Sequence, residues 1–200
     1  MTDNRDEIVN KAFFQFLNRG YKACSLKDLE QATGLTKGAF YYYFRTKEEI
    51  LKEGLERYAS VTEDLCEAEF TKIVSLRQYI EMVLQEKERR ASALRELFGD
   101  FIFEEFYFQL VLEVEHLFPE YRQRIDDLVK NRLARWEQVI LKAKQNGEIR
   151  NRLDTSVLAR NLMSVATSML NIELSSADLK YVFSDMRMQF EQYYMLIKNG

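Results

Sequence analysis

Apolar residues recur three and four positions apart from the start of the chain. Over residues 5–19 this spacing predicts a helix with one buried face, made of Ile8, Ala12, Phe13, Phe16 and Leu17. Gly20 follows directly, and glycine tolerates the left-handed conformation that commonly ends a helix. We therefore expect the first helix to end at Arg19.

Two short helices are expected next. Ser25 and Asp28 have the spacing of a capping box, in which the hydroxyl accepts a free backbone N–H and the acid reaches back, so a helix should begin there. Gly34 makes a tight turn before another short helical stretch over residues 36–43. Two short helices across a glycine turn form a helix-turn-helix.

The rest of the chain keeps the helical spacing. Thr46 and Glu49 repeat the capping-box pattern and open a helix that should run to about residue 70. Pro119 suits the first turn of a helix, because its missing N–H costs nothing there. Further helices are expected over 76–91, 94–117, 120–145, 154–173 and 177–198. The expected fold class is therefore all-α, with a three-helix head, a larger helical bundle and about nine helices.

Charge is distributed unevenly along this pattern. The chain carries a net charge of −3, yet residues 19–47 hold six basic and two acidic residues, a local +4 that leaves −7 for the rest. A positive segment inside an acidic protein is a candidate footprint for a polyanion. Charged patches are more often plain solvated surface, so charge by itself leaves the partner open.

The remaining composition indicates an intracellular protein. The first ten residues are charged and polar, which predicts no signal peptide, and the longest uncharged stretch, residues 161–172, is too short to span a bilayer. We expect a cytoplasmic location. Cys24 and Cys66 lie far apart without metal-ligand spacing, so reduced thiols are expected, with a redox role for Cys24 as the alternative.

One segment carries a recognisable motif. From Thr33 to Leu51 the sequence is TGLTKGAFYYYFRTKEEIL, preceded by Arg5, Ile8, Ala12, Phe16, Gly20, Tyr21, Ser25, Leu29 and Ala32. The glycine turn, the short helix, its aromatic end and the start of the next helix occur together in order. This first quarter of the chain closely resembles the TetR family of bacterial helix-turn-helix transcriptional regulators.

The second short helix would then be the recognition helix. Such a helix packs one face on its domain while another enters the major groove of DNA. Ala39, Phe40 and Phe44 suit the packed face, which leaves Thr36, Lys37, Tyr41 and Tyr42 for DNA. Successive helical side chains diverge by roughly 100°, so at least one residue of the Tyr41–Tyr43 run must face outward. A core or capping role remains the alternative for each tyrosine.

Gly38 lies in the middle of this helix, where glycine weakens helical structure unless another surface must come close. A DNA backbone or base edge would be such a surface. Close packing against the first helix is the alternative.

The resemblance implies individual roles. Residues matching Ser25, Tyr42 and Lys47 hold phosphates in the family, and those matching Thr36, Lys37 and Tyr41 face the groove. Ser25 and Lys47 both lie at helix N-termini, whose free N–H groups suit phosphate.

Domain organisation follows the same resemblance. Residues 1–46 would form the DNA-binding domain, residues 47–200 the effector-binding and dimerisation domain, and the helix over 47–70 would connect them. One recognition helix reads few base pairs, so a homodimer on a palindromic operator is expected. In the family the last two helices pair, here 154–173 and 177–198, although their apolar seams equally suit an internal core.

Residues 97–117 are apolar around most of a helical circumference, which predicts a buried helix. The resemblance implies a cavity for a small-molecule effector in this region, and aromatic richness favours an apolar or aromatic ligand. Plain core packing is the alternative for these side chains. The candidate lining residues are Phe101, Phe103, Phe106, Tyr107, Leu110 and Trp136.

No enzyme, metal site or cofactor is predicted. Glu113 and His116 have the E-x-x-H form of carboxylate-bridged metal sites, but these sites need a second pair and the chain has one histidine. The expected function is a dimeric repressor that a small-molecule effector releases from DNA. The alternatives are a DNA-binding dimer without an effector and, as a different class, a helical ligand-binding protein or enzyme.

Overall fold

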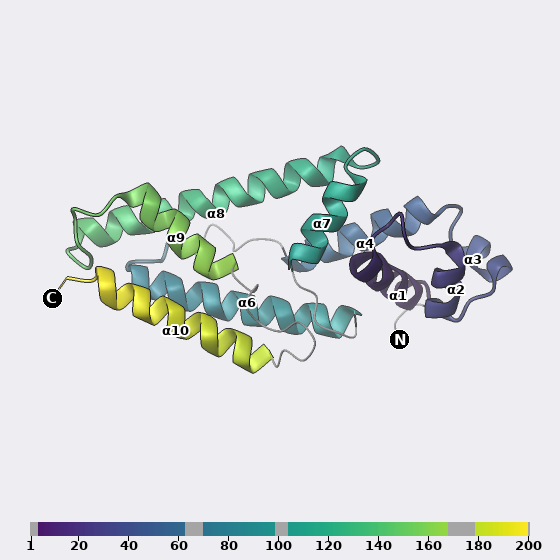
Figure 1. The fold of residues 1–200 in the computed structure, drawn as a ribbon, viewed down its shortest axis with the longest axis horizontal. Helices are drawn as coiled ribbons and strands as arrows, with labels where there is room; N and C mark the ends of the chain where they lie inside the picture. The colour runs from purple at the N-terminus through teal and green to yellow at the C-terminus, as the bar shows by residue number, and fades with distance from the viewer. Residues whose placement is uncertain (1–3, 63–69, 99–103, 168–178, 200) are drawn as a thin grey trace. The chain divides into compact units, whose positions relative to one another are not determined.

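The computed structural model describes residues 4–62, 70–98, 104–167 and 179–199. Within these ranges the chain forms nine α-helices and no strand, which confirms the all-α fold class (Figure 1). The helices pack into two compact units, one of residues 1–63 and 90–126 and the other of residues 64–89 and 127–200. None of the described helices has the length and apolar character needed to cross a membrane.

The first unit contains the helix-turn-helix. Its helices are α1 (Asn4–Arg19), α2 (Leu26–Thr33), α3 (Lys37–Tyr43), α4 (Lys47–Thr62) and α7 (Glu104–Val114). Helix α1 packs against α2, α4 and α7. Its predicted apolar face is confirmed as part of the core, with Ile8, Ala12, Phe13, Phe16 and Leu17 all buried.

Local signals fix the turns of this unit. Gly20 and Gly34 have φ angles of 81° and 75°, a region that non-glycine residues rarely adopt, and each ends a helix as expected. The capping box at the start of α2 is present, because the Ser25 side chain accepts the Asp28 N–H and the Asp28 carboxylate accepts the Ser25 N–H. These local predictions are confirmed.

A close approach of α1 and α4 depends on Gly54. A Cβ atom at this position would overlap the ring of Phe13, so the two helices pack at this distance only because residue 54 has no side chain. Phe13 also lies 5.4 Å, between ring centroids, from Phe98 near the end of α6. Nothing in the pattern of apolar residues singled out Gly54.

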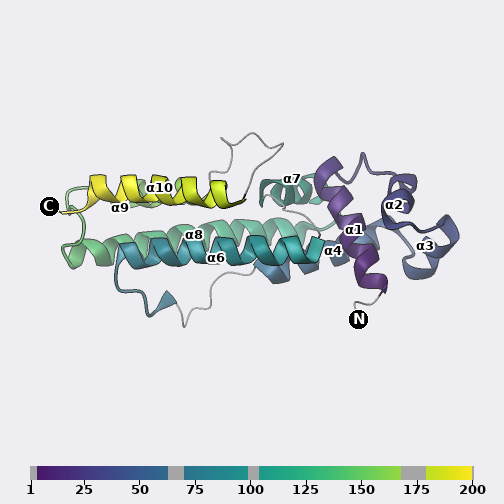
Figure 2. The same ribbon diagram turned by 90° about the horizontal axis from the view of Figure 1, so that it is seen from below.

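The second unit has its own core. It is built from most of α6 (Leu76–Phe98), most of α8 (Pro119–Gln145), α9 (Thr155–Thr167) and α10 (Leu179–Ile197). Trp136 is buried at its centre, stacked on Phe190 and in edge contact with Tyr79. Helix α10 lies beside α6 (Figure 2), and ion pairs of Arg77 with Glu191 and of Arg187 with Glu81 join the two.

Two helix boundaries differ from those expected. The predicted break between residues 91 and 94 is wrong, because α6 continues to Phe98. Ala91, Leu94 and Phe98 are buried on one face of this helix, and no glycine or proline interrupts it. Consequently the helix predicted over 94–117 is α7, which begins at Glu104.

Other predicted ends fall on residues that the structure does not describe. Residues 63–70 of the predicted connecting helix, residues 168–173 and residues 177–178 belong wholly or largely to this group. The division into domains at residue 46 is a functional prediction that the two packing units do not test.

Candidate nucleic-acid interface

Helix α3 has one buried and one open face. Phe40 and Phe44 are each 1% exposed, whereas Tyr41 is 48% and Tyr42 is 85% exposed. The predicted packed face is therefore present, and two of the three consecutive tyrosines point to solvent. Tyr41 makes a T-shaped contact with Phe40, and Tyr42 makes one with Tyr43. Both rings still expose a large aromatic surface that is available to a partner.

The start of α3 is also open. The Thr36 hydroxyl accepts the Ala39 N–H at 3.3 Å as the N-cap of the helix, and both Thr36 and Lys37 are exposed. Lys37 makes no ion pair with any residue that the structure describes. Its ammonium group is therefore available to an acceptor outside the chain.

Gly38 lies on the same open face. A Cβ atom built there would meet nothing within 4 Å, so the alternative that Gly38 allows close packing against α1 is wrong. The absence of a side chain creates a flat place between Lys37 and Tyr41 where another molecule can approach the helix backbone.

Ser25 is exposed at the N-terminus of α2. Its hydroxyl donates to the Asp28 carboxylate at 2.5 Å and accepts the Asp28 N–H at 3.2 Å. The Ser25 hydroxyl and the Ser25 N–H, which both donate to the Asp28 carboxylate, lower the pKa of Asp28 to about 2 together with Arg19. The first N–H groups of any helix lack intrahelical acceptors, so this end of α2 can still bind an anion.

Lys47 is engaged within the head. Its Nζ atom donates to the carbonyl oxygens of Tyr21 at 2.6 Å and Cys24 at 2.7 Å, and it lies 3.9 Å from the centre of the Tyr21 ring. An ammonium group has three donors, so one remains for a phosphate. The sequence pattern placed Lys47 at a helix start but did not reveal these two acceptors.

Tyr21 and Glu48 complete this cluster. The Tyr21 hydroxyl donates to Glu48 Oε1 at 2.5 Å, and this hydrogen bond lowers the pKa of the Glu48 carboxyl. Burial, reinforced by Glu48, raises the pKa of the Tyr21 phenol far above its ordinary value. The hydroxyl therefore stays protonated and the link to α4 persists at physiological pH.

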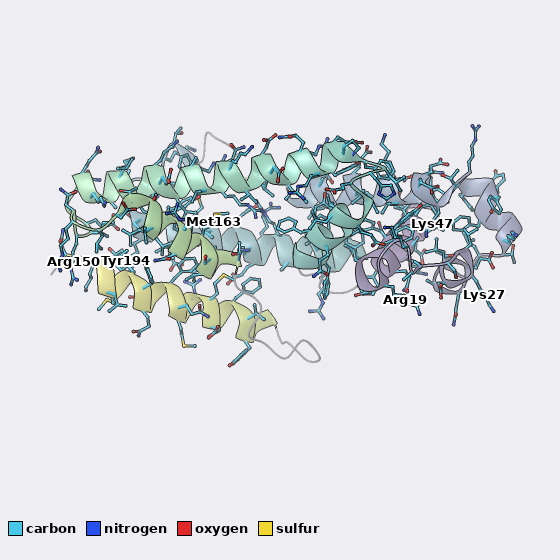
Figure 3. All side chains as sticks on the ribbon, turned by 45° about the horizontal axis from the view of Figure 1, so that its top comes forward. Arg19, Lys27, Lys47, Arg150, Met163 and Tyr194 are labelled. Carbon is cyan, nitrogen blue, oxygen red and sulfur yellow. The ribbon has the colours of Figure 1, made fainter. Side chains whose placement is uncertain are left out.

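The positive segment contributes several cations that are open to a ligand. Arg19 is neutralised by Asp28 at 2.7 Å. Among the described residues Lys27, Lys37 and Arg45 form no ion pair, and all three are exposed on or beside α2 and α3. Figure 3 labels Arg19, Lys27 and Lys47 in this part of the chain. The helix-turn-helix thus presents positive charge in an otherwise acidic protein.

Comparison with known proteins identifies this segment. Residues 8–53 match the model of "Bacterial regulatory proteins, tetR family". The helix-turn-helix segment of this chain is therefore similar to that of TetR-family regulators. The repressor KstR2 of Mycolicibacterium smegmatis is 33% identical over 54 residues, which are 27% of this chain and 26% of that protein. The sequence match thus spans about a quarter of this relative.

Solved structures extend the likeness to the whole fold. KstR2 of Mycobacterium tuberculosis, described as a ketosteroid transcriptional regulator, has a TM-score of 0.67 at 16% identity and covers 100% of this chain and 97% of its own. AibR, solved with isovaleryl coenzyme A and operator DNA, has a TM-score of 0.59 at 19% identity over 92% of this chain and 96% of its own. The likeness in fold to these proteins therefore includes both packing units.

The predicted effector-binding residues do not form one set. Phe106, Tyr107 and Leu110 pack in the core of the first unit, and Tyr107 stacks on Tyr58 with ring centroids 3.9 Å apart. Trp136 belongs to the core of the second unit. Phe101 and Phe103 lie outside the described residues. Packing in a hydrophobic core therefore explains the apolar character of the four described residues, Phe106, Tyr107, Leu110 and Trp136.

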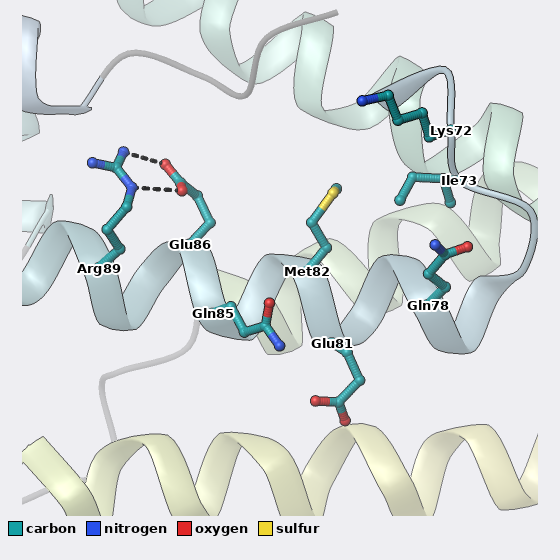
Figure 4. Close-up of a pocket in the computed structure, with 8 residues that line it drawn as sticks. All are labelled: Lys72, Ile73, Gln78, Glu81, Met82, Gln85, Glu86 and Arg89. Atoms are coloured by element: carbon teal, nitrogen blue, oxygen red, sulfur yellow. Dashed lines mark hydrogen bonds and ion pairs between the residues drawn. The ribbon is translucent and has the colours of Figure 1, made fainter. Parts of the chain in front are cut away.

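A groove of about 550 Å³ lies along α6 in the second unit. Figure 4 shows Met82 and Glu86 on one side of the helix and Glu81 directed toward α10. Glu86 pairs with Arg89 at 2.6 Å, and Glu81 pairs with Arg187 at 2.6 Å, so both carboxylates have cationic partners. The lining is mixed in polarity and was not indicated by the sequence. It includes Lys72, Ile73, Gln78 and Gln85.

Two further positions were considered from the sequence, Glu113 for a metal site and Cys24 for a redox role. Glu113 accepts two backbone N–H bonds, and no metal-binding group of three or more ligands occurs among the described residues. Cys24 is buried, and this burial raises the pKa of its thiol, which disfavours the reactive thiolate. Cys66 lies outside the described residues. The structure therefore favours an ordinary thiol at Cys24.

Proposed function

We propose that this chain is a transcriptional regulator that binds operator DNA through α3. The observation that carries the proposal is the division of this helix into a buried face, with Phe40 and Phe44, and an open face on which Tyr41 and Tyr42 are exposed. The open face fits the major groove because it combines a cation, two tyrosines and a glycine. Its residues are Thr36, Lys37, Gly38, Tyr41 and Tyr42.

The contacts divide into two kinds. Ser25, Tyr42 and Lys47 contact phosphates, which position the head without reading sequence. Thr36, Lys37 and Tyr41 face the base edges, and Gly38 lets the helix backbone come close. The exposure of Tyr42 and the remaining N–H of Lys47 support the first assignment.

The regulator acts as a homodimer through α9 and α10. Along α10, Tyr181, Met188 and Met195 are exposed at intervals of seven residues and so share one face of the helix. Val157 is exposed on α9. An apolar stripe of this length on a single chain suits a second copy of the same stripe, and two heads together read a palindromic site.

A small molecule controls this binding. AibR, of the same fold, was solved with both isovaleryl coenzyme A and operator DNA. We propose that the present chain is a cytoplasmic repressor, not an enzyme, that an effector releases from its operator. The groove along α6 is the candidate effector site, because its mixed lining suits a ligand with both apolar and charged parts.

Selection of bound sequences from random duplex DNA tests the DNA-binding function. The full chain should enrich a palindrome, and the Tyr42→Ala variant, which removes only an exposed side chain, should bind the selected duplex more weakly while keeping its thermal stability. A wild-type chain that enriches no sequence contradicts the proposal. An enriched site without two-fold symmetry contradicts the dimer.

A screen for compounds that release the chain from the selected duplex tests the effector. Met82→Trp fills the groove along α6 and should abolish the response to an active compound without changing DNA affinity. Retained response excludes this groove, and no response to any compound supports a dimer without an effector. Turnover of an active compound would instead favour an enzyme.

A further inference from the structure

The turn between α1 and α2 is held by a carboxylate from α7, 92 residues further along the chain. Glu113 Oε2 accepts the backbone N–H of Tyr21 at 2.8 Å, and Glu113 Oε1 accepts that of Lys22 at 2.7 Å. Consecutive backbone N–H groups that converge on one point form an anion-binding site. Here the anion is a side chain of the same unit.

Gly20 makes room for this carboxylate. Its φ angle of +81° directs the next two N–H groups toward α7, and a Cβ atom at this position would lie 2.9 Å from Glu113 Oε2. A side chain at residue 20 would therefore strain the backbone and crowd the carboxylate. The glycine serves the contact with α7 as well as the end of α1.

The same turn is held from its other side by α4. Lys47 Nζ binds the carbonyl oxygens of Tyr21 and Cys24, and the Tyr21 hydroxyl binds Glu48. The peptide groups of Tyr21 are thus bound by α7 through the N–H and by α4 through the oxygen. Ser25, the N-cap of α2, follows directly after Cys24. Both attachments together fix where α2 begins.

We propose that Glu113 is a positioning residue for DNA binding. It holds the turn before α2, and thereby the first helix of the helix-turn-helix, in the orientation in which the head binds DNA. Helix α7 then belongs to the DNA-binding machinery, and a rearrangement of α7 reaches α2 through this carboxylate. The proposal rests on the DNA-binding function proposed above.

The test compares Glu113→Gln with Glu115→Gln in the full chain. Both substitutions remove one negative charge from the same end of α7, and Glu115 contacts Arg122 instead of the turn. Removing an acid near DNA should leave affinity unchanged or raise it. The Tyr21 and Lys22 N–H groups bind different oxygens of Glu113, and glutamine replaces one of these oxygens with an NH2 donor, so one N–H group loses its acceptor. We therefore expect about tenfold weaker binding of the selected duplex by Glu113→Gln alone.

Two further readouts separate positioning from loss of folded protein. Titration at stoichiometric concentrations gives the active fraction, which should equal that of the wild type, so that the change lies in Kd. Hydrogen exchange on peptides covering residues 20–24 should be faster in Glu113→Gln and unchanged in Glu115→Gln. The salt dependence of binding should keep its slope, because Glu113 touches no phosphate.

Equal affinities for the two variants, or unchanged exchange at residues 20–24, overturn the proposal. If Glu113→Gln lowers the active fraction, the Glu113→Asp variant is measured instead, because aspartate keeps the charge but has a shorter side chain. Wild-type affinity in Glu113→Asp also overturns the proposal. Failure of the wild type to select any duplex rejects the DNA-binding function instead, and the exchange measurement then still shows whether Glu113 holds the turn.

Discussion

The Lys47 ammonium group lies over the Tyr21 ring and donates to the Tyr21 carbonyl oxygen at 2.6 Å. Lys47 begins α4, whereas Tyr21 lies in the turn between α1 and α2. The Lys47 side chain therefore links α4 to the turn between α1 and α2. The same ammonium keeps one N–H for a ligand, so its two roles can be separated by measurement.

Lys47→Ala should weaken DNA binding about equally for all sequences. Loss of one phosphate contact should also make the dependence of log K on log salt shallower by about one unit. The measurement is a salt titration on the selected duplex and on scrambled DNA. Lys52→Ala, which removes an exposed cation from the same helix, should leave both quantities unchanged. Weaker binding with an unchanged slope would assign Lys47 to the turn alone.

Lys37→Ala should change which operator is preferred, because Lys37 lies on the open face of α3 and makes no ion pair with described residues. Relative affinities over a library of operator variants measure this. Lys27→Ala removes an exposed cation from α2 and should lower all affinities alike. If the order of preference is the same for Lys37→Ala and the wild type, Lys37 does not read bases.

Gly38→Ala should stabilise the fold and weaken DNA binding. An alanine Cβ meets nothing within 4 Å inside the chain, and alanine is favoured over glycine in a helix by up to ~1 kcal/mol. The same methyl group would stand between the helix and DNA. Urea unfolding and operator titration measure the two effects, and equal or tighter DNA binding would show that close approach at Gly38 is unnecessary.

Gly54→Ala is the matched control for this change. Its Cβ atom would overlap the Phe13 ring, so the same substitution should destabilise the first unit instead. Opposite signs for the two free energies of unfolding are the expected result.

Alkaline pH should destabilise the first unit through Tyr107. Burial raises the pKa of its phenol from 10.0 to about 12, so the folded state favours the neutral form. The stabilisation is complete below pH 10 and is lost as the pH rises toward 12, at a rate of up to about 1.4 kcal/mol per pH unit. Tyr107→Phe keeps the ring stacked on Tyr58 and removes the ionisable hydroxyl.

Unfolding midpoints in urea at pH 9 and pH 11 measure this dependence. The variant should lose less stability between the two values than the wild type does. An identical loss would mean that other groups, such as Tyr21 and Tyr121, whose pKa values burial also raises, account for the effect.

Met188→Glu should dissociate the dimer while each chain stays folded. Met188 is 57% exposed in the single chain, so the substitution buries no charge in its own core. In a dimer it would place two carboxylates in an apolar contact, and we expect self-association at least about tenfold weaker. Sedimentation measures this. Leu141→Glu on α8, where Leu141 is 48% exposed, should leave association unchanged.

Local features of this protein followed from the sequence with few errors. The capping box of Ser25 and Asp28, the helix end at Gly20 and the helix start at Pro119 all depend on residues within a few positions of one another. The buried and open faces of α3 followed from helical periodicity in the same way. The helix end predicted at residue 91 was wrong, because no local signal ends a helix there and α6 continues to Phe98.

The neighbours of acidic and aromatic side chains were harder to predict. Glu113 was considered as half of a metal pair, yet it holds a turn 92 residues away. The aromatic residues proposed for an effector pocket include Tyr107, in one core, and Trp136, in the other. Composition identifies an aromatic or acidic side chain but not the neighbour that it meets.

The sequence by itself determined the helices, the helix-turn-helix and the open face of α3, because periodicity, capping and glycine conformation act over a few residues. Only the tertiary structure decided what Lys47 and Glu113 bind. Both use their charge on backbone groups of a turn that is distant in sequence, and such meetings depend on how α1, α4 and α7 pack together.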